Sequence, residues 1–280
     1  MQQTWTEEIK AEHRLFSINW REVWHYRDLL WLLVKRDYIT YYKQTILGPI
    51  WFFLQPILTV AIYMVLFGRI ARIPTDGVPE LAFYLSGIVL WNYFSEALTK
   101  TSTVFRDNAN VFGKVYFPRL IMPLSIVFSG LLKLGVQFSL FLGVVIYYSL
   151  SGKIEPSASY LLLFPVLVLL MALFAMGTGL IFSSLTTKYR DLAFLLVFGV
   201  QLFMYVTPVV YPVSAVPPFL AELLQWNPLT AIFEYFRMGF LGSGNPNPMA
   251  LLKSAAIIAL LFGAGVLIFN KVEKDFMDTV

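Results

Sequence analysis

The chain has 280 residues, of which 58% are hydrophobic and 14% charged, with a formal net charge of +4 and a mean hydropathy of +0.68. Ordinary soluble domains are about 45–50% apolar and about 25% charged, so this composition excludes a soluble globular protein. Cysteine is absent and the two histidines, His13 and His25, both lie near the amino terminus, which excludes disulfide scaffolds, thiol catalysis and histidine-centred metal or catalytic sites.

The first predicted element is an amphipathic helix within residues 17–45 that does not cross the membrane. Between Trp20 and Tyr42, aromatic and aliphatic side chains recur at spacings of three and four residues, and charged side chains occupy the other faces. Such a composition is typical of a helix that lies in the cytoplasmic membrane interface. A soluble amphipathic helix that docks on another protein is the alternative.

Six apolar stretches follow, each close to the length of about 20 residues that a helix needs to cross a hydrocarbon core of about 30 Å. We therefore predict an all-α integral membrane protein with a single transmembrane domain. Only Glu96 and Lys133 can ionise within these stretches, which argues against an ion-relay carrier, and Lys133 either reaches the interface or faces the interior or a second subunit. The predicted spans are residues 50–67, 81–99, 120–150, 158–185, 192–211 and 254–270.

The segment 212–250 between the last two spans is too apolar for an exposed loop and too interrupted for a crossing. Pro217 and Pro218 open one short helix, and Asn227 and Pro228 cap and start a second one. Helices of roughly 10 and 13 residues are too short to span, so we expect a re-entrant pair in the external leaflet. A plain extracytoplasmic loop is the alternative.

The distribution of Lys and Arg predicts the orientation of the bundle. With six spans both termini lie on one side, where fifteen Lys and Arg residues also fall, against five on the other side. The positive-inside rule therefore places both termini in the cytoplasm, and it explains the net positive charge without a nucleic-acid partner. The first 28 residues contain acids and bases and no apolar core, so we expect no cleavable signal peptide.

Glycines and aromatic residues have structural explanations. No G-x-x-x-x-G-K-[ST] motif occurs, and the G-x-G pairs that begin at Gly177 and Gly263 lie inside apolar spans, so the chain does not bind ATP through a P-loop. Ala175, Gly179 and Ser183 form a stripe of small residues, which predicts close helix packing. Aromatic residues make up 17% of the chain and suit interfacial belts as well as stacking on sugar rings.

Five groups of motifs occur in order along nearly the whole chain. They are KRD at 35–37 with YKQTILGPIW at 42–51 and QP at 55–56, YFPR at 116–119 with PL at 123–124, KYRD at 188–191, TPVVYP at 207–212, and NP at 227–228 with Arg237. This ordered set resembles the membrane subunits of bacterial ATP-binding cassette (ABC) polysaccharide exporters. These are the type 2 permeases that export O-antigen, capsule or teichoic acid.

The resemblance implies a permease of the bacterial inner membrane that exports a lipid-linked polysaccharide, with O-antigen as the expected class, from cytoplasm to periplasm. It also implies a homodimer bound to two copies of a separate ATPase, which binds ATP and Mg²⁺, so that this chain has no cofactor and is not an enzyme. The alternatives are a capsular polysaccharide or teichoic acid exporter, and a drug or small-lipid exporter of the same fold. A membrane-embedded glycan- or lipid-modifying enzyme would need a cluster of acids or histidines, which the sequence lacks.

The resemblance also assigns residues that couple the chain to the ATPase. In the family, the short helix after span two and the turn after span four contact the ATPase, and the amino-terminal interfacial helix contributes to that contact. The positive-inside rule by itself also accounts for these charges. The coupling residues are Arg106, Asp107, Asn110, Lys114, Lys188, Arg190 and Asp191, and those of the interfacial helix are Lys35, Arg36, Asp37, Tyr42, Lys43 and Gln44.

The external segment is expected to act as a gate. Irregular backbone at membrane depth is tolerated only where protein or a water-lined cavity covers it, which a closed path in a dimer would provide. Glu234 and Arg237 are three residues apart on a predicted helix, so we expect them to form an ion pair. The residues expected to line the external gate and the glycan path are Tyr211, Trp226, Phe233, Tyr235, Phe236 and Arg237. Packing of the segment from Pro228 onward against lipid is the alternative.

Overall fold

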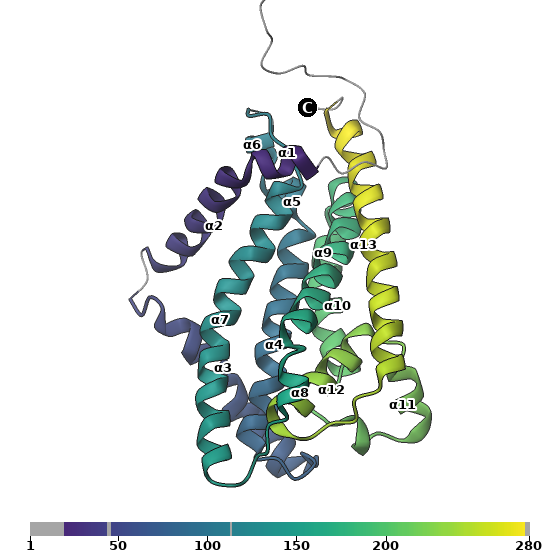
Figure 1. Cartoon of the computed structure of the whole chain (residues 1–280). Helices are drawn as coiled ribbons and strands as arrows, with labels where there is room; N and C mark the ends of the chain where they lie inside the picture. Colours follow the sequence, from purple (N-terminus) through teal and green to yellow (C-terminus); the bar gives the residue numbers. More distant parts are fainter. Residues whose placement is uncertain (1–19, 44–45, 113, 278–280) are drawn as a thin grey trace, which may run out of the picture.

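The computed structural model describes residues 20–43, 46–112 and 114–277, and for residues 20, 41, 42 and 273–277 it describes the backbone only. Every regular element in this part of the chain is a helix (Figure 1). The long helices form one bundle, and short helices cover both of its ends. The all-α fold expected from the sequence is confirmed for the described residues.

The elements fall into three groups along the chain. The amino-terminal pair is α1 (Trp20–His25) and α2 (Arg27–Tyr42). The long helices are α3 (Ile50–Tyr63) with its π-helical continuation η1 (Met64–Ile70), α4 (Glu80–Thr101), α7 (Ile121–Leu150), α9 (Phe164–Lys188), α10 (Leu192–Val206) and α13 (Pro248–Met277). The short helices are α5 (Val104–Asp107), α6 (Ala109–Phe112), α8 (Ala158–Leu161), the 3₁₀-helix η2 (Val213–Ala215), α11 (Pro218–Leu224) and α12 (Pro228–Leu241).

Within the described part of the chain, four helical segments are long and apolar enough to cross a membrane, namely residues 50–70, 121–150, 158–188 and 248–272. They correspond to the first, third, fourth and sixth predicted spans. The last of them begins at Pro248, before the predicted start at 254, because proline suits the first turn of a helix and the single charge of Lys253 does not interrupt it. The second and fifth predicted spans correspond to α4 and α10, which are not among these four segments. The helix α4 carries several polar residues, and α10 has only 15 residues.

The helix α4 is the centre of the bundle. It packs against α3, α7, α9, α10 and α12, and most of its side chains are buried. Polar residues of α4 bond within the helix and across it: Ser86 donates to the Phe83 carbonyl of α4, and the Asn92 amide donates to Gln137 Oε1 on α7 at 3.4 Å. Because protein groups satisfy these side chains, α4 does not need the apolar surface of a helix that faces lipid.

Small residues bring α9 close to its neighbours, as the stripe in the sequence predicts. A Cβ added to Gly177 would lie 2.6 Å from Cα of Phe262 on α13, and one added to Gly179 would lie 2.6 Å from Cβ of Thr101 on α4. Ala175 is buried as well. Glycine therefore allows these backbones to approach to a distance that any larger residue would prevent.

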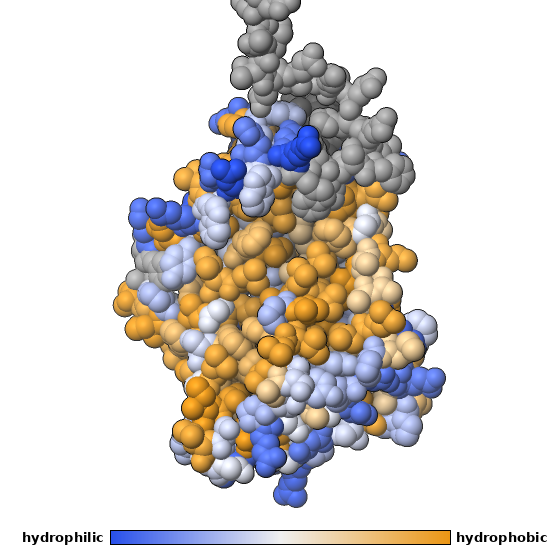
Figure 2. Space-filling model, in the orientation of Figure 1, coloured by the Kyte–Doolittle hydropathy of each residue, from blue (hydrophilic) through white to orange (hydrophobic). Residues whose placement is uncertain are grey.

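The two ends of the bundle carry different helices (Figure 1). The end that carries α1, α5, α6 and the carboxyl-terminal part of α13 is called the α5 end here, and the opposite end, with α8, α11 and α12, is called the α12 end. Figure 2 shows a broad apolar band between two more hydrophilic ends, which is the surface expected of a protein that crosses a bilayer.

The predicted amino-terminal helix is divided at Tyr26 into α1 and α2. The helix α2 packs along α7, with Leu33 and Val34 buried in the contact. Trp31 of α2 is exposed, as is Trp24 of α1. Thus α2 has both an apolar face bound to the bundle and aromatic side chains available to an interface.

Candidate functional site

The predicted coupling residues gather at the α5 end. They come from two segments that lie far apart in the sequence, the region of α5 and α6 and the turn between α9 and α10. All seven side chains are exposed. Arg106 and Asp107 are on α5, Asn110 is on α6, Lys114 follows α6, Lys188 ends α9, and Arg190 and Asp191 form the turn that leads into α10.

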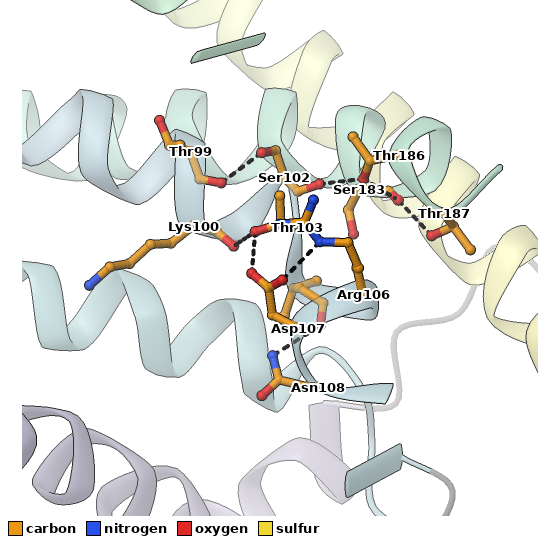
Figure 3. A network of polar contacts seen from close by, with 11 residues as sticks. Thr99, Lys100, Ser102, Thr103, Arg106, Asp107, Asn108, Ser183, Thr186 and Thr187 are labelled. Atoms are coloured by element: carbon orange, nitrogen blue, oxygen red, sulfur yellow. Dashed lines mark hydrogen bonds and ion pairs between the residues drawn. The ribbon is translucent and has the colours of Figure 1, made fainter. Parts of the chain in front are cut away.

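A network of hydrogen bonds joins these two segments (Figure 3). Thr186 Oγ1 in the last turn of α9 donates to the Ser102 carbonyl oxygen at 2.6 Å, directly after α4. Ser102 Oγ in turn donates to the Thr99 carbonyl at 2.6 Å, and Thr103 Oγ1 donates to Asp107 Oδ2 at 2.6 Å. The end of α4, the helix α5 and the end of α9 are therefore mechanically connected.

The short helix α5 is fixed to the bundle by its apolar side. Val104 and Phe105 are buried, and the Phe105 ring stacks on Phe269 of α13 with centroids 4.5 Å apart. Arg106 and Asp107 on the other side are exposed and paired with each other at 2.9 Å. The charged groups of α5 are therefore exposed on a helix that is packed firmly on the bundle. This arrangement suits the binding of a partner, and a displacement of α5 would be transmitted to α4, α9 and α13.

Asp37 links the interfacial helix α2 to the bundle through a polar contact. Asp37 forms an ion pair with Arg36 at 2.8 Å, and its other oxygen accepts a hydrogen bond from Ser129 Oγ on α7 at 3.3 Å. A carboxylate on the inner face of α2 thus helps to hold that helix on α7. Lys35 and Lys43 are exposed, and the Tyr42 side chain and Gln44 lie outside the described residues.

At the α12 end, most of the aromatic residues expected to line a path are buried within the protomer. Phe233, Tyr235 and Phe236 are almost fully buried, whereas Tyr211 is half-buried and Trp226 is 70% exposed. The cause is the position of α12, which is enclosed by α4, α8, α9 and α13. In this conformation the three buried rings belong to the core, and of the set only Trp226 is fully open to the outside.

Arg237 anchors the irregular segment that follows α10. Its guanidinium donates to the Val209 carbonyl at 2.8 Å and to the Tyr211 carbonyl at 3.3 Å, and it lies 3.9 Å from the ring centroid of Phe83 on α4. The side chain is only 1% exposed. Burial lowers the pKa of Arg237 to about 10, so the guanidinium keeps its charge at neutral pH. The contact joins α12, α4 and the end of α10.

The expected ion pair between Glu234 and Arg237 does not form. Glu234 Oε2 instead accepts a hydrogen bond from the Asn245 backbone N–H at 2.7 Å, in the link to α13. The prediction failed because it considered only neighbours on one helix. In the folded protein both charged groups bind backbone atoms of non-helical segments, and Arg237 satisfies the buried carbonyl of Val209, which would otherwise lack a partner.

One ionic contact inside the bundle joins α4 and α7. Glu96 accepts from Lys133 Nζ at 2.6 Å and pairs with Lys100 Nζ at 2.8 Å. Of the alternatives for Lys133, the structure therefore shows the interior one. The sequence singled out both Glu96 and Lys133 as rare intramembrane charges, but nothing in it showed that α4 and α7 are neighbours at this level. Among the described residues, no group of three or more His, Asp or Glu side chains could hold a metal ion.

Similarity to known proteins is consistent with this architecture. The O-antigen export system permease protein RfbA of Klebsiella pneumoniae is 28% identical over 253 residues, which cover 90% of this chain and 94% of the relative. RfbA of Myxococcus xanthus is 27% identical over 263 residues, with 93% and 98% covered. The polysialic acid transport protein KpsM of Escherichia coli is 22% identical over 206 residues, with 73% and 78% covered.

The family match also extends over most of the chain. Residues 28–241 match the family described as ABC-2 type transporter, a region that contains both coupling segments and the whole external segment up to the end of α12. With its several apolar helices of membrane-spanning length, the chain is a multi-pass protein of the inner membrane. It belongs to the ABC-2 type transporter family.

Proposed function

We propose that this chain is the permease subunit of an ATP-driven exporter that moves a lipid-linked polysaccharide of the O-antigen type from the cytoplasm to the periplasm. The observation that carries the proposal is the similarity to two proteins named O-antigen export system permeases over at least 90% of each chain. ATP and Mg²⁺ are bound by a separate ATPase subunit, in keeping with the absence of a P-loop from the sequence.

The proposed assembly is a homodimer of this chain with two ATPase subunits, which dock on the α5 end. The exposed charges of α5 and of the turn between α9 and α10 support this assignment, since the network through Thr186 and Ser102 connects them. Reversing both charges in Arg190→Glu/Asp191→Lys should reduce copurification with the ATPase and glycan export. Insertion should be unchanged, and Lys153→Glu at the α12 end is the control. Normal export by the double variant would argue against docking at this turn.

The proposed topology has six spans with the α5 end and both termini in the cytoplasm. The helix α10 rises only about 22 Å over its 15 residues, at about 1.5 Å per residue. The residues 207–210 that continue it are buried, and Arg237 satisfies the carbonyl of Val209. This supports a fifth span that is completed by irregular backbone under a cover of protein. Labelling of engineered cysteines from either side of the membrane tests the orientation.

The external gate is proposed to move through α11 rather than α12. The helix α12 is buried, whereas α11 packs mainly on η2 and exposes Leu223 at 62%, followed by Trp226 at 70%. The test is a disulfide between Leu223→Cys residues of the two subunits, with Leu162→Cys, also exposed, as the control. Loss of export on crosslinking and its return on reduction are expected. Undiminished export through a crosslinked dimer would leave α11 only a structural plug.

The substrate assignment is tested by deleting the gene and locating the glycan. Surface glycan should disappear, lipid-linked glycan should accumulate inside, and the wild-type gene together with its ATPase should restore export. A deletion strain with normal surface glycan would contradict the proposal. The similarity to KpsM, named a polysialic acid transport protein, favours capsular polysaccharide as the second candidate, and the sugar composition of the accumulated glycan separates the two.

A further inference from the structure

A cleft of about 660 Å³ opens between α4 and α10 and contains polar groups in an otherwise apolar part of the bundle. Clefts of about 300–1,000 Å³ are typical of small-molecule binding sites. The lining combines aromatic rings with hydrogen-bonding groups. The residues that the argument uses are Tyr63, Glu96, Lys100, Gln201 and Tyr205.

Gln201 is the feature of this cleft that packing does not explain. The helix α10 is strongly apolar, and Gln201 is its only residue with an amide or a charge. The side chain is exposed and has no hydrogen-bond partner among the described residues. A primary amide without a partner at membrane depth is costly, and polar residues within membrane spans usually mark a substrate or ion pathway.

The opposite wall of the cleft holds a carboxylate in a fixed position. Glu96 is held between Lys133 on α7 and Lys100 one turn further along α4. By contrast, the hydroxyl groups of Ser95 and Thr99 donate to backbone carbonyls of α4. The other polar groups that line the cleft are the Gln201 amide and the ion-paired Glu96 carboxylate and Lys100 ammonium, which together offer both donors and acceptors.

These groups match the chemistry of a sugar ring. Each ring hydroxyl both donates and accepts a hydrogen bond, and the C–H face of a pyranose packs on aromatic rings such as those of Tyr63 and Tyr205. A lipid acyl chain would satisfy the aromatic rings but leave Gln201 without a partner. A monovalent metal ion would satisfy Glu96 but make no use of the rings.

We propose that this cleft is a saccharide-binding site, in which Gln201, Glu96 and Lys100 bind hydroxyl groups of one sugar of the exported glycan. The inference rests on the proposed export function and assigns to it a specific recognition site. In this site Gln201, which lies in the otherwise apolar helix α10, determines the affinity for the glycan.

Cysteine protection tests the site directly, because the native chain contains no cysteine. Val197→Cys and Thr99→Cys place a thiol on each wall of the cleft and leave Gln201 unchanged. Phe194→Cys places one elsewhere on α10, at a residue that is 78% exposed and does not line the cleft. Each variant is coexpressed with an ATPase that binds but does not hydrolyse ATP. Membranes come from cells that make the glycan and from cells that lack its first glycosyltransferase, and the rate of N-ethylmaleimide labelling is measured.

Labelling at both cleft positions should be about fivefold slower when the glycan is present at about four times its dissociation constant. The reason is that the fraction of unoccupied sites falls by the factor 1 + [L]/Kd. Labelling of Phe194→Cys should not change. Equal labelling at both cleft positions with and without glycan would overturn the inference. In that case normal glycan export by the wild-type complex would leave the proposed function intact, whereas absence of export would refute the function itself. Copurification of each variant with the ATPase shows that it is folded.

Discussion

Replacing Arg237 by methionine tests whether this side chain fixes the segment that follows α10. Methionine fills much of the space but donates no hydrogen bond, so the carbonyls of Val209 and Tyr211 lose their donor at a cost of about 1–3 kcal/mol each. The contact with Phe83 contributes about 0.5–2 kcal/mol. Removing a buried charge returns part of its desolvation penalty. The expected net loss of stability is about 3 kcal/mol.

Two measurements follow from that magnitude. A loss of about 1 kcal/mol lowers the unfolding midpoint of a chain of this size by about 2–4 °C, so the Arg237→Met protein in detergent should unfold about 6–12 °C lower. Hydrogen exchange should increase in residues 207–212 before it increases in α4. The unfolding midpoint of Arg237→Lys should lie between those of the wild type and Arg237→Met. The lysine ammonium keeps the charge, but it cannot reproduce the planar set of donors of the guanidinium.

The control is Arg69→Met, which removes an exposed arginine outside this contact. The reasoning would be refuted by an Arg237→Met protein that unfolds at the temperature of the control and has unchanged exchange in residues 207–212. Such a result would mean that the backbone of this segment is held by packing and not by the guanidinium.

Three further substitutions test the packing and the coupling network. Gly177→Val places a Cβ 2.6 Å from the backbone of Phe262, so it should destabilise the protein by about 3 kcal/mol or more, measured by thermal unfolding; an unchanged midpoint would contradict the close approach of α9 and α13. Thr186→Val leaves the buried Ser102 carbonyl without its donor, at about 1–3 kcal/mol, and should weaken ATPase copurification while Thr187→Val does not. Asn227→Ala removes the cap of α12, at about 1 kcal/mol, and also the donor to the Val206 carbonyl and Thr207 Oγ1, so exchange should become faster both in the first turn of α12 and at the end of α10.

Several helices follow directly from the local sequence. The apolar stretches at 50–67 and 120–150 correspond to α3 with η1 and to α7, because an unbroken run of apolar residues in a membrane has no alternative to a helix. The starts of α11 and α12 were predicted from Pro218 and from Asn227, whose Oδ1 accepts from the Leu229 N–H at 3.0 Å. These features depend only on neighbouring residues.

The candidate coupling site was predicted in part. The exposed charges of α5 and of the turn after α9 are visible in the sequence, since short charged segments between apolar spans must face water. Their connection is not visible, because Thr186 and Ser102 are 84 residues apart and resemble any other hydroxyl residues near helix ends. A hydrogen bond between such residues depends on which helices are neighbours, and no local pattern contains that information.

Charged side chains show the same difference between what the sequence determines and what the tertiary structure determines. By itself, the sequence determined that Glu96 and Lys133 are unusual, because a charge within an apolar span is costly without a partner. Only the tertiary structure decided what those partners are: Glu96 and Lys133 pair across α4 and α7, and Arg237 binds the carbonyls after α10 instead of pairing with Glu234. The physical reason is that helix periodicity limits which residues share a face, whereas the packing of helices that are distant in sequence determines what that face contacts.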